Sequence, residues 1–462
     1  MPEILVVRLH DRVVGQLRRG RDPSRVRLTI GEDFDTGLTT LTDSFTVIPG
    51  TEAPSDTVSN FLGGYVPEGN HRTVMASRRG VDPGDLFALL REFGGSLAGA
   101  VTVRPPGGYD GQPTAGWLAD MSESGLADRL RQALRETDQA VPDDSRSTLP
   151  GFQPKVLACR AAGGWAQPHG AAHSTHILKP AVPGRSSRLV DEHYGHLLAQ
   201  AAGLSGFASE LLVADDVDFL AIQRFDRLVL PGPAVALLHQ EDAAQALGLD
   251  WRTSEAKFQD PHWPDNPARA SAGSVAQLLA TDPGSATLLR DWVRRLVFSV
   301  ALGDNDAHAK NIALLHTGQG TVLAPVYDAV PNLFARDMID EGFRLAFAVN
   351  GAFDHRHVSA DSLVAEVQSW RLIAPSVASA AVSDAVAVCT QAVQEVSPPD
   401  GVSMGLVDKL TWTVDRLAAG DIVGTSPWQA GKSMTIPGPR SGPASERTAG
   451  ASRTDQHGAT DR

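Results

Sequence analysis

The segment Gly303-Asp304-Asn305-Asp306-Ala307-His308-Ala309-Lys310-Asn311-Ile312 constrains the fold more than any other part of the chain. In it, Asp306 and Asn311 are five residues apart, and downstream Asp328 follows the apolar run at 322–326. A hydroxyl-orienting Asp and a metal-binding Asn have this spacing in phosphoryl-transfer sites, where a strand and a second metal-binding Asp follow. Such chemistry needs two metal ligands, a positioned hydroxyl and a cation on the phosphates.

The bulk properties exclude several classes of protein. A chain of 462 residues, 42% apolar and 21% charged, suits two or three folded domains. Its sequence lacks a run of about 18 apolar residues, so we expect no membrane span, and residues 1–8 read as a strand rather than a signal peptide. The cysteines, Cys159 and Cys389, lack metal-ligand or redox spacing, which suits a reducing cytoplasm. A net charge of −13 argues against broad nonspecific binding to nucleic acid.

The first third of the chain reads as a small β-rich subdomain followed by a connection. We expect the subdomain over residues 1–105 and a linker region, with one helix at 121–135, over residues 106–145. A helix at 85–93 has Asp85 as its cap. The strands expected in the subdomain are 4–9, 13–17, 26–30, 45–48 and 100–103.

The rest of the chain has the order of a two-lobed enzyme. Residues 146–230 are predicted to form an N-lobe core of strands with one helix, and residues 231–424 a helical C-lobe that carries the catalytic loop. We therefore predict an α+β, two-lobed, protein-kinase-like fold with ATP between the lobes. Residues 425–462 are low in apolar side chains and are expected to be a disordered, dispensable tail. The elements expected in the two lobes are strands 156–159, 175–178, 210–214 and 219–224, and helices 190–202, 240–247, 275–279, 286–302, 360–394 and 402–419.

The acidic and amide side chains suit a magnesium site. Asp306 is the candidate base, and it must stay ionised near the acceptor hydroxyl. Asn311 and Asp328 offer the oxygen ligands that Mg²⁺ prefers. The alternative is that Asp306 and Asn311 only cap or turn a helix end, as Asp and Asn often do.

A lysine upstream is placed to contact phosphates. Lys179 ends the apolar strand at 175–178, as the phosphate-pairing lysine of kinases does, although a strand-end lysine is more often solvated. Glu192 on the following helix is a candidate partner for Lys179, with Asp191 and Glu210 as competitors.

Two further segments are candidates for contact with the nucleotide. In Thr148-Leu149-Pro150-Gly151-Phe152-Gln153-Pro154-Lys155, Gly151 permits a close approach of backbone N–H groups to an anion, but the segment also reads as an ordinary Pro/Gly turn. Gln223-Arg224-Phe225 ends a strand where a hinge would hold adenine by backbone groups, or where Phe225 simply enters the core. His308 is either structural or close to the phosphates.

Together these segments resemble the HipA-like serine/threonine kinase toxins of bacterial type II toxin–antitoxin systems, over about residues 3–420. The similarity rests on their order along the chain. The segments are 149–155, 175–180, 224–227, 240–248, 305–311 and 323–328, with 60–69 and 99–101 in the early part.

The resemblance implies roles for particular residues. Asp306 would be the catalytic Asp, and Asn311 and Asp328 would bind Mg²⁺. The cofactor-binding residues for ATP would be Leu149, Pro150, Gly151, Phe152, Gln153, Pro154, Lys155, Lys179, Gln223, Arg224, Phe225, His308, Lys310 and Tyr327. Where the family carries an autophosphorylated serine before the Gly-containing loop, this chain has Thr148, preceded by Ser147. Self-inactivation is therefore either in doubt or moved to one of these two residues, where a phosphate would add negative charge beside ATP.

The resemblance also implies partners. These toxins bind a small helix-turn-helix antitoxin, and operator DNA through it, and their protein substrates include an aminoacyl-tRNA synthetase. Two other interpretations remain open. The chain could phosphorylate a lipid or small molecule, because Asp306, His308 and Asn311 also match a pattern of phosphoinositide-type kinases. It could instead be a catalytically silent corepressor subunit.

Overall fold

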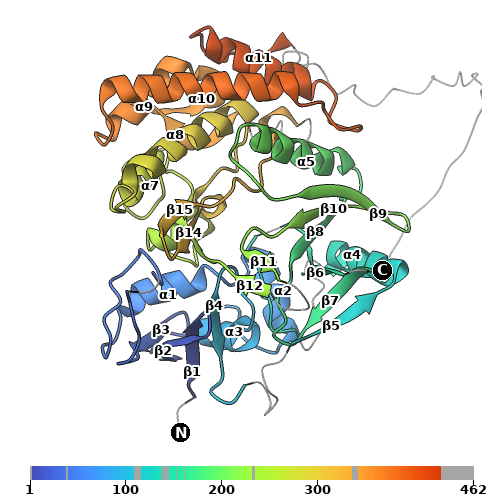
Figure 1. The fold of residues 1–462 in the computed structure, drawn as a ribbon, viewed down its shortest axis with the longest axis vertical. Helices are drawn as coiled ribbons and strands as arrows, with labels where there is room; N and C mark the ends of the chain where they lie inside the picture. The colour runs from blue at the N-terminus through green and yellow to red at the C-terminus, as the bar shows by residue number, and fades with distance from the viewer. Residues whose placement is uncertain are drawn as a thin grey trace, which may run out of the picture.

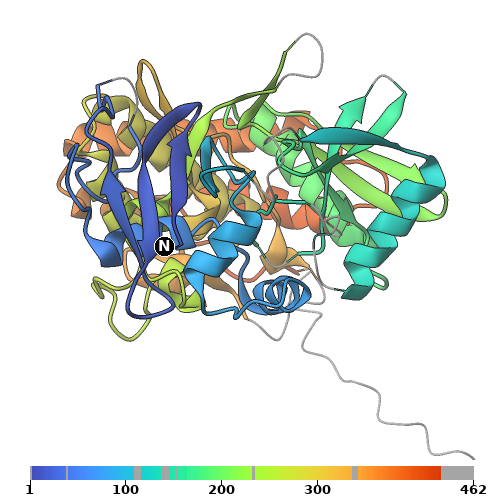
Figure 2. The ribbon, with the colours of Figure 1, turned by 90° about the horizontal axis from the view of Figure 1, so that it is seen from below.

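Three units make up the protein in the computed structural model. They are an N-terminal unit (residues 3–108), a six-stranded sheet with two helices (residues 116–223), and a helical lobe (residues 239–427). Figure 1 shows the helical lobe above the other two units, and Figure 2, seen from below, shows the N-terminal unit and the sheet side by side beneath it. The structure describes residues 3–37, 40–108, 116–136, 139, 145–151, 153–161, 163–230, 235–335 and 342–427.

The N-terminal unit is a four-stranded antiparallel sheet covered by three helices. Its strand order is β3-β2-β1-β4. Alternate residues of β1 and β3 are buried, so one face of the sheet packs on the helices. Helices α1 and α2 are additions to the elements that the sequence predicted. The elements are β1 (Leu5–Leu9), β2 (Arg12–Arg19), β3 (Val26–Ile30), α1 (Ser55–Gly63), α2 (Gly69–Arg78), α3 (Leu86–Phe93) and β4 (Val101–Arg104).

The strand expected at 45–48 is wrong, because this stretch is a loop. The loop is held by side chains rather than by a strand partner. The Thr42 hydroxyl accepts a hydrogen bond from Ser44 N–H at 3.0 Å and donates to a carboxylate oxygen of Glu241 at 2.6 Å. The Phe45 ring packs edge-on against Phe61, with ring centroids 6.2 Å apart. Phe45 and Val47 are thus packed on the core without a ladder, while Ile48 stays exposed.

The six-stranded sheet is antiparallel throughout, with the order β5-β7-β6-β8-β10-β9. Helix α4 shares a core cluster with one side of the sheet, and α5 carries Leu189 into a second cluster with Leu220 and Ile222. The elements are β5 (Trp117–Met121), α4 (Glu123–Glu136), β6 (Val156–Ala161), β7 (Gly164–His169), β8 (His176–Pro180), α5 (Ser186–Ala201), β9 (Ser209–Ala214) and β10 (Val217–Gln223).

Part of the region expected to be a linker belongs to this sheet. Strand β5 pairs with β7 from Trp117 to Met121, and the buried residues Leu126 and Leu130 of α4 pack on the sheet. Residues 117–136 are thus an integral part of the sheet unit rather than a connection. Helix α4 buries only one face, which is why a charged and glycine-rich sequence around it read as a linker.

The helical lobe holds the largest core of the molecule, around α8, α10 and α11. A three-stranded sheet of order β13-β14-β15 lies next to the loop at 303–311. The elements from residue 227 onward are β11 (Arg227–Val229), β12 (Val235–Leu237), β13 (His239–Asp242), α6 (Ala243–Ala246), α7 (Ala272–Leu279), α8 (Ser285–Leu302), β14 (Ala313–Thr317), β15 (Gly320–Leu323), β16 (Arg344–Val349), β17 (Ala352–Asp354), α9 (Ala360–Ser369), α10 (Pro375–Glu395) and α11 (Leu406–Ala418).

Two expected helices of this lobe need correction. Within 240–247 only the short helix α6 forms, because the residues before Asp242 pair with β14 and Asp242 caps the helix through a capping box with Gln245. The stretch 360–394 is two helices, since Pro375 starts α10 at a position where its missing N–H costs nothing.

Helix α10 is long and apolar enough to cross a bilayer by length and composition alone. In the structure, its buried residues pack against α8, α9 and α11, as in the core of a globular lobe (Figure 1). The expected disordered tail lies almost wholly outside the described residues, which end at 427.

Candidate active site

A cavity of about 200 Å³ is lined by all three units. The N-terminal unit contributes residues that include Tyr65 and Glu68, the sheet unit residues that include Lys155 and Lys179, and the helical lobe residues that include Asp306. Most of the predicted site residues line it: Leu149, Pro150, Gly151, Gln153, Lys155, Lys179, Gln223, Arg224, Phe225, Asp306, His308, Lys310, Asn311, Tyr327 and Asp328. Pro154 is not among the lining residues that the structure describes, and Phe152 lies outside the described part of the chain.

The loop after α8 is shaped by Gly303. This residue has φ 68°, and a Cβ there would meet the Phe334 ring at 2.7 Å, so a glycine is needed both for the turn and for the close approach. Beyond it, Asp304 accepts a hydrogen bond from Asp306 N–H at 2.9 Å. The Asn311 amide then donates to the Asp306 carbonyl at 2.8 Å. These bonds bring Asp306 and Asn311, predicted as partners from their spacing, side by side.

Asp306 carries an unusual charge environment. Burial raises its pKa to about 6, with Asp328 and Glu68 adding to the rise and Lys257 opposing it. About half of its side chain is still exposed (51%), so the carboxylate is reachable from the cavity. Asp304 beneath it is fully enclosed, and burial together with Asp306 raises its pKa well above the usual value. A carboxylate that is neither paired nor fully solvated is typical of a reactive group.

His308 contributes a neutral ring to the same loop. Its Nε2 lies 3.4 Å from an Asp306 carboxylate oxygen, and burial lowers its pKa to about 3. The Phe258 ring packs edge-on against it at 4.9 Å. His308 is therefore a packed, uncharged neighbour of Asp306.

Lys179 forms a buried ion pair with Glu192, as predicted, at 2.6 Å. The competing residues are used elsewhere, since Asp191 accepts hydrogen bonds from Ser403 and Glu210 lies on the surface near Arg160. The Lys179 ammonium also contacts Asp328. Although burial opposes it, Asp328 and Glu192 raise the pKa of Lys179, so this lysine is a fixed cation in the cavity.

Asp328 is held in a strained conformation against α5. Its φ of 52° lies in the left-handed region, which a residue with a Cβ seldom adopts. The next residue approaches α5 so closely that a Cβ on Gly195 would lie 1.9 Å from the Ala329 carbonyl oxygen. Burial opposes the ionisation of Asp328, but Lys179 overcomes it and lowers the pKa. The carboxylate therefore stays charged at the cavity wall.

The residues present fit a magnesium ion. Asn311 uses its amide nitrogen in the bond to Asp306, which leaves its oxygen for a ligand, and Asp328 supplies an ionised carboxylate. An amide oxygen and a carboxylate are hard oxygen ligands of the kind that Mg²⁺ takes.

The glycine-containing loop folds around a lysine. Lys155 Nζ donates to the Pro150 carbonyl at 2.8 Å, and Gly151 has φ 108° with its Cα close to that ammonium. Burial and the nearby Lys179 lower the pKa of Lys155 to about 8. Because the Lys155 ammonium bonds to a carbonyl rather than to a carboxylate, its charge favours an anion at this end of the cavity.

The two candidate modification sites are buried. Ser147 donates its hydroxyl proton to the Ser96 carbonyl at 3.1 Å, and Thr148 N–H donates to the same carbonyl at 3.1 Å. Their exposed fractions are 1% and 0%. Neither hydroxyl can reach a nucleotide unless this segment leaves its place.

The opposite end of the cavity is apolar. The rings of Phe225 and Tyr327 lie 5.3 Å apart, and Ile177, Phe207 and Ile222 pack around them. An apolar region lined by aromatic rings suits an aromatic base.

The strand end at this apolar region is partly committed to the sheet. Gln223 N–H donates to Ala208 O and Arg224 N–H to Thr175 O, both at 2.9 Å. The Arg224 side chain turns into a buried network, with bonds to Asp226 and to Ser174. The N–H groups of Gln223 and Arg224 are therefore already used. If Gln223 to Phe225 hold adenine by backbone groups, the contacts must come from Phe225 and from the carbonyls of this segment.

The sequence interpretation named Lys310 but missed Glu68 and Lys257, which form a second charged cluster with it in the cavity. Glu68 ion-pairs with Lys310 at 3.0 Å and with Lys257 at 3.4 Å. Although burial opposes it, the two lysines lower the pKa of Glu68 to about 2. No local pattern identifies these residues, because the contacts join positions 242 and 189 residues apart.

Comparison with known proteins agrees with this architecture. A family model described as HipA N-terminal domain matches residues 5–104, and one described as HipA-like C-terminal domain matches residues 147–397. The "Putative kinase Y4mE" of Sinorhizobium fredii is 32% identical over 299 residues, 62% of this chain and 69% of the relative. The "Serine/threonine-protein kinase toxin HipA" of Shewanella oneidensis is 25% identical over 318 residues, 67% of this chain and 71% of the relative.

A solved structure confirms the predicted fold class. The fold resembles that of HipA from Shewanella oneidensis MR-1, solved with HipB and operator DNA, with a TM-score of 0.72 and 22% identity over 90% of this chain and 100% of that one. The α+β, two-lobed, kinase-like fold is therefore confirmed. With a family model covering more than half of its residues, the chain belongs to the HipA-like family.

Proposed function

We propose that this protein is an ATP- and Mg²⁺-dependent serine/threonine protein kinase and the toxin of a type II toxin–antitoxin module. One observation carries the proposal. Three separate segments of the chain line one cavity, and they contribute Asp306 with Asn311, Lys179, and Asp328. Relatives of the chain carry kinase names, which supports the same chemistry.

Asp306 is assigned to the acceptor hydroxyl. With a pKa of about 6, its carboxylate is mostly ionised at neutral pH and basic enough to accept a proton as the hydroxyl attacks. Asn311 and Asp304 hold its backbone, which fixes the direction of the side chain. Phosphoryl transfer depends mainly on such positioning.

The remaining groups are assigned to the nucleotide. Lys179, fixed by Glu192, contacts the phosphates, and the loop at 149–155 covers them. The apolar region beside Phe225 and Tyr327 receives the adenine. Asn311 and Asp328 hold Mg²⁺, which when bound neutralises charge on the phosphates.

Partners and location are inferred from relatives. The structure of the Shewanella oneidensis protein includes HipB and operator DNA. We expect a helix-turn-helix antitoxin partner for this chain, with operator DNA bound through it, in the cytoplasm. The expected acceptor is a protein of translation such as an aminoacyl-tRNA synthetase.

Self-phosphorylation is expected only after a loop movement. Because Ser147 and Thr148 are buried and bonded to Ser96, the segment 145–151 must leave its place before either hydroxyl can react. A phosphate would then prevent its return, since two negative charges would be buried beside the nucleotide site.

Intact-mass spectrometry after incubation with ATP and Mg²⁺ tests the proposal, beside an Asp306→Asn control. One added phosphate that maps to Ser147 or Thr148, absent from the control, supports both the kinase and its self-inactivation. Transfer to a purified synthetase without self-modification supports the kinase alone. Labelling of phospholipid rather than protein would favour a lipid kinase.

A growth assay separates the enzyme from a silent corepressor. Expression of the wild-type chain is expected to arrest growth, and Asp306→Asn is expected to relieve the arrest. Arrest that survives this substitution would show that toxicity does not depend on phosphoryl transfer.

A further inference from the structure

Glu68 belongs to the N-terminal unit, yet its carboxylate lies in the cavity with the catalytic loop. Its side chain is 10% exposed, and those of its partners Lys310 and Lys257 are 12% and 9% exposed. Lys310 precedes Asn311 in the catalytic loop, and its carbonyl accepts the Tyr327 hydroxyl proton at 2.8 Å. Lys257 is close enough to Asp306 to lower the pKa of that carboxyl. One acid from a distant unit thus pairs with both cations on this side of Asp306.

The local structure around Glu68 would allow a different contact. Glu68 is the N-cap residue of α2, with φ −106° and ψ 155°, and a side-chain acceptor at this position commonly satisfies the first N–H groups of the helix. Among the described residues, the Glu68 carboxylate makes no such capping bond. It is directed to the two lysines instead, which indicates that the helix end serves the cavity.

The N-terminal unit is fixed firmly enough to place one side chain. Tyr65, which lies three residues before Glu68, donates its hydroxyl proton to the Gln240 carbonyl at 3.0 Å. A Cβ on Gly64 would lie 2.3 Å from Gln245 Cγ, so the chain here touches the helical lobe directly.

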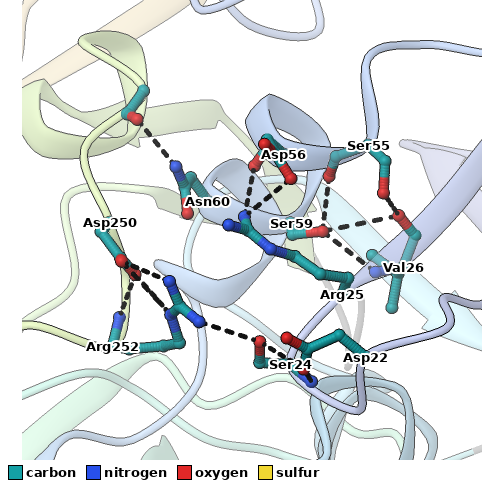
Figure 3. A network of polar contacts seen from close by, with 11 residues as sticks. Asp22, Ser24, Arg25, Val26, Ser55, Asp56, Ser59, Asn60, Asp250 and Arg252 are labelled. Atoms are coloured by element: carbon teal, nitrogen blue, oxygen red, sulfur yellow. Dashed lines mark hydrogen bonds and ion pairs between the residues drawn. The ribbon is translucent and has the colours of Figure 1, made fainter.

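Further contacts continue this interface along α1. The Asn60 amide donates to the Gly248 carbonyl at 2.9 Å. Arg252 donates to the Ser24 hydroxyl at 3.2 Å, a contact that Figure 3 shows. These bonds join α1 and the turn before β3 to residues 248–252 of the helical lobe. Because the N-terminal unit is held at several points, Glu68 is already in position, and placing it costs no further entropy at each turnover.

Two buried ammonium groups need an acid between them. Without Glu68, Lys257 and Lys310 would lose the carboxylate that they share in a poorly solvated site. Each would then move toward another acid, and Asp306 is the one that Lys257 already influences. The catalytic carboxylate would become an ion-pair partner in place of a hydroxyl acceptor.

We infer that Glu68 is a positioning residue of the kinase site: it holds Lys257 and Lys310 beside Asp306, where they face the negative charge that develops on the transferred phosphoryl group. This inference rests on the proposed function. It makes the N-terminal unit part of the active site. On this inference, Lys257 and Lys310 face the phosphoryl group in transfer, whereas Lys179 contacts the bound nucleotide.

The test is the steady-state kinetics of the full chain with Glu68→Gln, Glu68→Asp and the matched control Glu52→Gln. Glu52 lies in the same unit and pairs with Arg27 at 2.6 Å on the surface. For Glu68→Gln we expect kcat to fall by about 10–100-fold with the KM for ATP changed by less than about threefold, as for loss of a positioning contact. Glu68→Asp keeps the charge on a shorter side chain and is expected to recover part of kcat, and Glu52→Gln is expected to match the wild type.

The outcomes separate the inference from the proposed function. An active wild type with kcat unchanged in Glu68→Gln overturns the inference alone. A loss confined to the KM for ATP also overturns it, because Glu68 would then serve nucleotide binding. If Glu68→Gln does not fold, kcat in Glu68→Asp decides: partial loss supports the inference, and wild-type kcat opposes it. A wild type that transfers no phosphate to itself or to a protein overturns both.

Discussion

Two aspartates, the buried Asp226 and the half-exposed Asp306, show how the same side chain serves opposite purposes in this fold. Asp226 lies between Arg224 and Arg227, at 2.8 and 2.9 Å, and accepts Gly99 N–H at 2.8 Å. Burial opposes its charge, but the two arginines lower its pKa well below the usual range. Asp306 has its pKa raised to about 6 by burial. A fully paired acid joins parts of the structure, whereas an incompletely paired one is available for chemistry.

The largest expected effect is the loss of phosphoryl transfer in Asp306→Asn. The amide keeps the shape of the side chain but cannot accept the hydroxyl proton, so we expect the rate to fall by at least about 10²–10⁴-fold. Transfer of labelled phosphate from ATP measures this. The free energy of unfolding in urea is expected to stay within about 1 kcal/mol of wild type, because a repelled, half-exposed carboxylate contributes little to stability. An Asp306→Asn variant that is destabilised but still active would show that Asp306 serves the structure, as Asp226 does, rather than the chemistry.

Asp226→Asn is expected to show the opposite result. It leaves two buried guanidinium groups without their anion, and breaking such a pair costs about 3–5 kcal/mol. Urea unfolding measures the cost. The matched control is Asp56→Asn, whose side chain is 80% exposed and pairs with Arg25 at 3.3 Å; a surface pair of this kind contributes at most about 1 kcal/mol. Equal losses in the two variants would show that the network around Asp226 does not join the units.

The pH dependence of activity sharpens the comparison further. Asp306 must be ionised to accept a proton, and its pKa in the free protein is about 6, so kcat/KM is expected to fall about tenfold for each pH unit below that value. Lys257→Met removes a charge that lowers this pKa, so the descending limb is expected to move to higher pH. Circular dichroism over the same range controls for unfolding. A flat profile between pH 5 and 7 would exclude Asp306 as the titrating base.

The sequence predicted the parts of the site that follow local rules. The spacing of Asp306 and Asn311 is set by one loop, and Lys179 and Glu192 meet because a strand end and the next helix are neighbours in such a lobe. Glu68 could not be predicted in this way. Its position depends on how the N-terminal unit docks on the helical lobe, through contacts that leave no periodic or spaced pattern in the sequence.

The errors in the fold have the same origin. The segment at 45–48 is apolar enough for a strand, but its place is decided by Thr42 and its bond to Glu241 in another unit. The segment before Asp242 reads as helix from its composition, yet β14 offers it a ladder. Tertiary contacts therefore overrode local propensity in both segments.

The smallest expected effect concerns the pair of Glu241 and His316, a second fully paired site that joins the Thr42 loop to β13 and β14. His316 Nε2 lies 2.8 Å from Glu241, and both side chains are buried. Burial lowers the pKa of His316, but the bond to Glu241 outweighs this and raises the pKa above 6.5. The stabilisation by the charged histidine is therefore complete below about pH 6.5 and is lost as the pH rises through the higher folded-state value.

We expect His316→Gln to cost roughly 1–3 kcal/mol at pH 6, as for a hydrogen bond to a charged group, and less at pH 9. Urea unfolding at the two pH values measures the difference, with the exposed His357→Gln as control. Equal costs at both pH values would mean that His316 is neutral in the folded protein. Glu241 and His316 would then be joined by a hydrogen bond to a neutral ring, unlike the charged pairs around Asp226.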